Sequence, residues 1–198
     1  MAISNRPQDK FAFLFSGSAD AQYIADLRKI LDTLLNWYGY PADQIYVRVA
    51  FDVSVLTDPL FSVPGLDINN ISGADSTELK DSLKSNLEEF IDSAKILLPD
   101  IPAGKLNNTF FYFTGAGRFH TGNSRYEIHI GTADDSTDTY IDGIWLKGRI
   151  INYDSTFPDN SHIHILMQQS RGYGFWQDVF SLITGTSLKM SFTAACNS

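Results

Sequence analysis

The chain carries one stretch that decides its fold: Thr109-Phe110-Phe111-Tyr112-Phe113-Thr114-Gly115-Ala116-Gly117. A short apolar run rich in aromatic residues that ends abruptly at glycine is typical of a buried strand followed by a tight turn. Two further runs have this form. Residues 11–15 lead into Ser16-Gly17-Ser18, and residues 162–167 lead into polar residues beginning at Gln168. The sequence therefore predicts three buried strands, each ending in a short polar or glycine-rich turn.

Helical periodicity separates these strands. Apolar residues recur every three or four positions over residues 24–38 and again over residues 79–98. Gly39 predicts the end of the first helix, because glycine is the usual residue at a helix C-terminus. Asp75, with Glu78 three residues later, predicts a capped start for the second helix.

Two more strands are predicted at residues 45–49 and 188–193, and a short turn of helix or strand near residues 144–151. Residues 52–75 hold two prolines and two glycines and are expected to form an irregular connection. Strands that alternate with helices and read as continuous apolar runs predict an α/β fold whose mostly parallel sheet is covered on both faces. In such sheets, ligands bind beyond the carboxyl ends of the strands.

Length and charge limit the classes of function. The 198 residues suggest a single domain spanning residues 1–198. Fifteen basic against 23 acidic residues give a net charge of −8, which argues against a nucleic-acid partner and against an anionic membrane surface. No apolar stretch approaches the 18 or so residues that a membrane-spanning helix needs.

A lone cysteine, Cys196, can form neither an internal disulfide nor a cysteine-rich zinc site. This usage favours a reducing compartment and hence a cytoplasmic location, with a cysteine-poor secreted protein as the alternative. The N-terminus lacks the apolar core of a signal peptide. The four histidines have no metal-ligand spacing, so neither a metal nor another cofactor is expected.

The polar turn after the third strand carries a motif. Residues 168–172 read Gln-Gln-Ser-Arg-Gly, which resembles the Gln-Ala-Cys-Arg-Gly nucleophile motif of caspases. Gln168, Arg171 and Gly172 match that motif. Gln169 replaces its alanine, and Ser170 stands at the position of the nucleophilic cysteine.

The glycine turn after residue 114 matches the other half of the caspase site. In that family the catalytic base is a histidine between two glycines, about 50 residues before the cysteine. Here Ala116 stands at the histidine position, between Gly115 and Gly117, and lies 54 residues before Ser170.

The order and spacing of elements along nearly the whole chain also resemble the superfamily of caspases, metacaspases and legumain-like peptidases. The resemblance implies a caspase-like three-layer α/β/α sandwich with a mostly parallel sheet. It implies backbone N–H groups near Gly117 and Ser170 that bind a carbonyl oxygen. It also places Asp20 in a loop that helps to shape the family's first specificity pocket, although a helix-capping role is equally expected for Asp20.

The chemistry of the family needs a thiolate nucleophile and an imidazole base. Ala116 has no proton acceptor, and the hydroxyl of Ser170 is a far weaker acid than a thiol. The first hypothesis is therefore a pseudopeptidase or regulatory protein that binds a protein or peptide partner. Two alternatives remain: a caspase-like cysteine endopeptidase that carries inactivating substitutions at both positions, and an unrelated small-molecule-binding α/β module.

Four other sets of residues receive weaker expectations. His120 is the first candidate for a replacement base but is not favoured in that role, and a structural role is favoured for His162 and His164, which share one side of a strand. His129 is expected to be an exposed strand residue. An acidic cluster is expected to be a solvated loop, with a weak calcium site as the alternative; its members are Asp134, Asp135, Asp138 and Asp142. The tryptophans are expected to be buried or half-buried; they are Trp37, Trp145 and Trp176.

The C-terminus at residues 195–198 is short for this superfamily, whose members continue past the last predicted strand. This favours truncation, processing or a partner chain that completes the fold.

Overall fold

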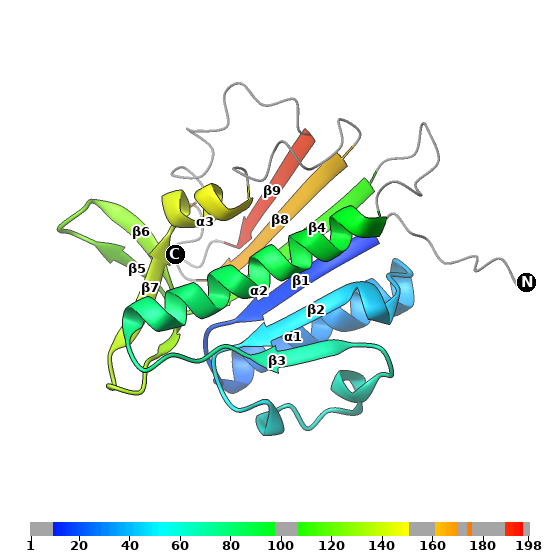
Figure 1. Ribbon diagram of the computed structural model, residues 1–198, viewed down its shortest axis with the longest axis horizontal. Helices are drawn as coiled ribbons and strands as arrows, with labels where there is room; N and C mark the ends of the chain where they lie inside the picture. Colours follow the sequence, from blue (N-terminus) through cyan, green and yellow to red (C-terminus); the bar gives the residue numbers. More distant parts are fainter. Residues whose placement is uncertain (1–9, 98–106, 151–160, 170–173, 176–188, 196–198) are drawn as a thin grey trace, which may run out of the picture.

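The computed structural model describes residues 10–97, 107–150, 161–169, 174–175 and 189–195. Its main feature is a six-stranded sheet in which every neighbouring pair is parallel and the strand order is β3-β2-β1-β4-β8-β9 (Figure 1). The strands are β1 (Lys10–Ser16), β2 (Ile45–Val49), β3 (Asp67–Asn70), β4 (Asn107–Gly115), β8 (Ser161–Gln169) and β9 (Lys189–Ala195). The predicted parallel α/β architecture is thus confirmed.

Helices cover both faces of this sheet. The helix α1 (Ala21–Asp32) lies behind the sheet in Figure 1, while α2 (Ser76–Leu97) crosses its front, accompanied by α3 (Gly143–Ile150). Short turns of helix follow α1 and join the early strands; they are η1 (Thr33–Trp37), η2 (Ala42–Gln44), η3 (Val53–Val55) and η4 (Pro59–Ser62). None of the helices in the described part of the chain is long and apolar enough to cross a membrane.

A second sheet lies at the carboxyl ends of the central strands. It is antiparallel, in the order β5-β6-β7, and consists of β5 (Gly117–His120), β6 (Arg125–Thr132) and β7 (Asp138–Asp142). Of this sheet the sequence predicted only that His129 of β6 is a strand residue, because β5 and β7 are short, expose many polar residues and lack continuous apolar runs. The irregular connection expected at residues 52–75 also contains a strand, β3, at the edge of the main sheet.

The continuous apolar runs follow from burial on both faces. Phe13 and Phe111 belong to the core beneath α2, where both rings contact Phe90 at centroid distances of 5.5 Å. Leu14 and Tyr112 belong to the core beneath α1. Since successive side chains of a strand point to opposite faces, a strand covered on both sides must be apolar at every position.

One charged side chain lies inside this core. Arg48 on β2 is 1% exposed and donates hydrogen bonds to the Asp67 carboxylate at 2.8 Å and to the side-chain oxygen of Asn86. A buried guanidinium needs such partners, because an unpaired charge in a low-dielectric interior is strongly destabilising. Arg48 therefore ties β2 to both β3 and α2.

The predicted start of α2 is confirmed in its details. Asp75 accepts hydrogen bonds from the N–H groups of Thr77 and Glu78 at 2.7 and 2.9 Å, and Glu78 accepts one from the N–H of Ala74 at 2.9 Å. The structure therefore has a reciprocal cap at this helix terminus.

Replacing the cap, Asp75→Ala, is expected to lower the free energy of unfolding by about 1 kcal/mol, because two helix N–H groups lose their acceptor. Urea denaturation followed by circular dichroism measures the change. Asp81→Ala removes an exposed carboxylate from the same helix and serves as the control. Equal losses in the two variants would contradict the capping role.

The first helical segment ends at Gly39 as predicted, but its last turn has an unexpected form. The N–H of Tyr38 bonds to the carbonyl of Thr33 at 3.0 Å, which makes the last turn π-helical. This wider turn leaves Trp37 82% exposed and Tyr38 61% exposed, so the expectation that Trp37 is buried was wrong. Gly39 follows with φ of +63°, as expected of a glycine helix stop. Trp145 is half-buried as predicted, and Trp176 lies outside the described residues.

Candidate functional site

The three predicted turns emerge at one edge of the central sheet. Ser16 of β1 lies opposite Thr114 of β4, and Gly115 lies opposite Gln169 of β8. Neighbouring strands are about 4.8 Å apart, so the chains leaving β4 and β8 start from adjacent positions. The carboxyl edge formed by β1, β4 and β8 is the candidate site. Ser170, Arg171 and Gly172 lie outside the described residues.

Two glycines allow the second sheet to reach this edge. A Cβ atom on Gly17 would overlap the carbonyl oxygen of His129 on β6, and one on Gly115 would lie 3.1 Å from the same oxygen. Gly115 also has φ of +151°, which few other residues adopt. The N–H of Gly17 bonds to the Thr114 carbonyl at 3.0 Å. Both glycines are therefore needed for close backbone packing, a role that sequence reasoning missed.

Ala116 lies exposed at the crossing of the two sheets. Its carbonyl oxygen accepts a hydrogen bond from the N–H of His129 at 2.8 Å, which fixes the backbone where the chain passes from β4 into β5. Its side chain is a methyl group, which can neither accept nor donate a proton. The position is exposed and its carbonyl is hydrogen-bonded to β6, but its side chain carries no catalytic group.

Gln168 of the motif is held by β4. The hydroxyl of Tyr112 donates to the Gln168 side-chain oxygen at 3.1 Å, and the hydroxyl of Thr114 donates to the Gln168 carbonyl at 2.9 Å. Burial raises the pKa of Tyr112, so its hydroxyl stays protonated and remains a donor. These contacts hold the carboxyl end of β8 against β4. The sequence analysis did not identify Tyr112 and Thr114 as partners of Gln168. Their positions two residues apart, which place them on the same face of β4, were the available signal.

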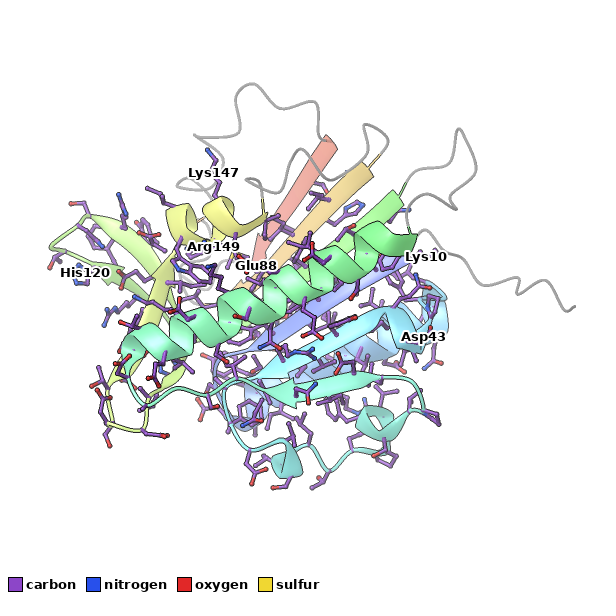
Figure 2. The ribbon with its side chains drawn as sticks, viewed as in Figure 1. Lys10, Asp43, Glu88, His120, Lys147 and Arg149 are labelled. Carbon is purple, nitrogen blue, oxygen red and sulfur yellow. The ribbon has the colours of Figure 1, made fainter. Side chains whose placement is uncertain are left out.

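His120 is poorly placed to act as a base at this edge. It ends β5, four residues beyond Ala116, and a strand rises about 3.3 Å per residue, so the two positions lie about 13 Å apart. Its Nδ1 accepts a hydrogen bond from the Asn123 N–H at 3.3 Å. Figure 2 shows His120 at the far end of the small sheet.

His129 is a strand residue as predicted, but the expectation that it is exposed was wrong. Its side chain is 15% exposed, because Tyr140 and Asp138 of β7 cover it. The imidazole Nε2 lies 3.3 Å from the Asp138 carboxylate. A hydrogen bond from Thr132 holds the pKa of Asp138 below its ordinary value, and His129 contributes to the same shift.

His162 and His164 share one side of β8, as the period of a strand requires, with ring centroids 4.0 Å apart. The Nδ1 of His164 is hydrogen-bonded to the hydroxyl of Ser191 on β9. Burial lowers the pKa of His164, and the neighbouring imidazole adds to the effect. These contacts join β8 to β9 and agree with a structural role.

The acidic cluster does not converge on one point. The backbone N–H groups of Asp134 and Asp135 bond to the carbonyls of Gly73 and Ala74 in a turn beside α2. The other two members occupy opposite ends of β7, where Asp138 bonds to Thr132 and Asp142 bonds to Arg125. Within the described ranges, no three histidine, cysteine or acidic side chains gather to hold a metal ion.

Asp20 lies exposed at the candidate edge, directly before α1. Asp20 occupies the N-cap position of α1, and its carbonyl accepts hydrogen bonds from the N–H groups of Tyr23 and Ile24, but its carboxylate makes no capping hydrogen bond. The backbone N–H of Asp20 donates a hydrogen bond to the hydroxyl oxygen of Ser18 at 3.2 Å.

A cavity of about 550 Å³ lies at the other end of the strands, between the end of the first helix and the sheet. Ile30, Leu34, Phe110 and Leu166 form its apolar wall, and Lys10, labelled in Figure 2 at the start of β1, contributes a charge. This volume is in the usual range for small-molecule sites, but the cavity does not include the motif residues.

The chain matches no known protein-family model, and no curated protein resembles it significantly in sequence.

Proposed function

We propose that the chain is a caspase-like domain without the catalytic dyad, which binds an extended segment of a protein or peptide at the carboxyl edge of its central sheet. The observation that carries the proposal is the pairing of Gly115 with Gln169. Ala116 and Ser170 are the residues that directly follow this pair in the sequence. That relation is what a nucleophile and its base would need in order to share one substrate carbonyl.

The chemistry at these positions supports binding without turnover. A serine hydroxyl needs an aligned base before it can attack a carbonyl, and the methyl group of Ala116 cannot provide one. The exposed backbone around Ala116 can still donate hydrogen bonds to a carbonyl oxygen, because N–H donors survive the replacement of side chains.

The protein is expected to retain peptides and to leave them uncleaved. A phage-displayed library of random 12-residue peptides, selected on the immobilised protein, provides binders for fluorescence anisotropy. Ala116→Trp should weaken their binding at least tenfold, because a bulky side chain would fill the candidate edge. Ser85→Trp is the matched control, since it enlarges a small exposed residue on α2 and should leave the affinity unchanged.

Mass spectrometry of the same peptides, and of peptides with Arg, Lys, Asn or Asp before the scissile bond, should detect no hydrolysis. Cleavage that disappears in Ser170→Ala would overturn the inactive assignment. If no peptide is enriched, or if Ala116→Trp and Ser85→Trp behave alike, the proposed binding function is wrong.

A further inference from the structure

The small sheet has two edges, and the structure covers them differently. The β7 edge lies beside α2, where the hydroxyl of Thr139 donates to that of Ser76 at 2.9 Å. At the other edge, β5 pairs with β6 on one side only, and no strand in the described ranges pairs with its second side. Exposed strand edges carry free N–H and C=O groups that can pair with another chain.

The register identifies which backbone groups of β5 point away from β6. Gly117 lies opposite Ile128, and the His129 N–H bonds to the Ala116 carbonyl. In an antiparallel pair, hydrogen-bonded and non-hydrogen-bonded positions alternate. Arg118 and His120 therefore direct their backbone groups toward β6, whereas Gly117 and Phe119 direct theirs away from it.

The strand is held firmly enough to act as a template. The Arg118 side chain pairs with Glu127 at 2.8 Å, and its guanidinium lies 3.4 Å from the ring centroid of Tyr140. The ring of Phe119 packs on Tyr126, with a centroid distance of 4.9 Å, and remains 36% exposed. These contacts order β5 before any ligand arrives, which lowers the entropic cost of binding.

The groups that point away from β6 begin at the candidate site, because Gly117 directly follows Ala116. We infer that a peptide bound at the carboxyl edge continues along β5 as an added strand, with its main chain paired to the N–H and C=O groups of Gly117 and Phe119. This inference rests on the proposed peptide-binding function and adds the conformation of the ligand and the groups that hold it. The ligand is an extended segment whose alternate residues must keep their backbone N–H groups.

The decisive comparison uses two substitutions at one position. Phe119→Pro removes an N–H that points away from β6, so the pairing of β5 with β6 can persist, and proline is tolerated at such edge positions. Phe119→Ala removes the ring but keeps that N–H. With a 12-residue peptide selected on the wild-type protein, Phe119→Pro should weaken binding at least tenfold, and Phe119→Ala less than threefold.

A second measurement leaves the protein unchanged and guards against misfolding of the proline variant. The selected peptide is synthesised with single N-methyl groups at successive residues. Strand addition predicts that methylation weakens binding at alternate residues, since only every second N–H of an added strand faces β5.

The outcomes separate the two proposals. In one outcome, Ala116→Trp abolishes peptide binding, Phe119→Pro and Phe119→Ala weaken it equally, and the N-methyl scan shows no alternation. Peptide binding at the carboxyl edge would then be supported, and strand addition along β5 would be wrong. If no peptide is enriched, or if binding is indifferent to Ala116→Trp, the proposed function fails and the inference fails with it.

Discussion

The double substitution Ala116→His with Ser170→Cys is expected to lower the pKa of the introduced thiol from the ordinary value of about 8.5 to about 6 or below. The physical reason is the ion pair that a thiolate forms with a neighbouring imidazolium. Gly115 and Gln169, the residues directly before the two substituted positions, are paired at one edge of the sheet, so we expect the two new side chains to interact.

The rate of alkylation by iodoacetamide as a function of pH reports the thiol pKa. A thiol with a pKa of about 6 is about one quarter ionised at pH 5.5, whereas an ordinary one is about 0.1% ionised. The lower nucleophilicity of an acidic thiolate offsets part of this gain, so about a tenfold faster reaction is expected at that pH. The midpoint of the pH profile should fall by about two units or more.

The matched control is the single variant Ser170→Cys, with Cys196→Ser in both proteins to remove the background thiol. Ala116→His alone should not raise the rate of alkylation, because the histidine acts only together with a thiol at position 170. Identical midpoints of the pH profile with and without the histidine would mean that the side chains at positions 116 and 170 do not interact. The peptidase-like interpretation of this edge would then lose its chemical basis.

Gly17→Ala should destabilise the fold by about 3 kcal/mol, the upper end of the usual range for overpacking. The added methyl group would overlap the carbonyl oxygen of His129. That oxygen belongs to the backbone of β6 and cannot move as the end of a flexible side chain can. Either β6 or the turn after β1 must therefore shift.

Urea denaturation compares this variant with Gly39→Ala. Gly39 has φ of +63° and open space where a Cβ would lie, so its replacement should cost only the roughly 1 kcal/mol of a left-handed conformation. Gly17→Ala should also weaken the binding of selected peptides, because the displaced strand carries the backbone that fixes Ala116. If Gly17→Ala costs no more than Gly39→Ala, the two sheets do not meet as closely as described.

The main sheet could be predicted from the sequence because each central strand is buried on both faces and reads as an unbroken apolar run. The capped start of α2 was visible for a similar reason, since Asp75 and Glu78 act on residues close to them in the chain. The small sheet could not be predicted in this way. All but one of the residues of β5 are exposed, and only two positions of β7 are buried, so neither strand has a recognisable hydrophobic period.

The sequence predicted the candidate site only in part. The end of a strand is visible in the local sequence, whereas the register between two strands depends on residues far apart in the chain. The sequence placed the turn at Gly115 and the motif at Gln168, but nothing near either residue reveals that Gly115 lies opposite Gln169. The same limit hid the contact of Gly17 with β6. That contact joins segments far apart in the chain, and glycine after a strand more often indicates a simple turn.

The order of the strands also has a consequence for the rate of folding. At the centre of the sheet, β1 pairs with β4, and Lys10 lies opposite Asn108, 98 positions later. The entropy of closing so long a loop must be lost before this pair gains any stability. Parallel sheets built from such distant pairs fold slowly, typically in milliseconds to seconds. Before β1 and β4 pair, their apolar segments are exposed to solvent and can aggregate. The yield of native protein after dilution from denaturant should therefore fall as the protein concentration rises.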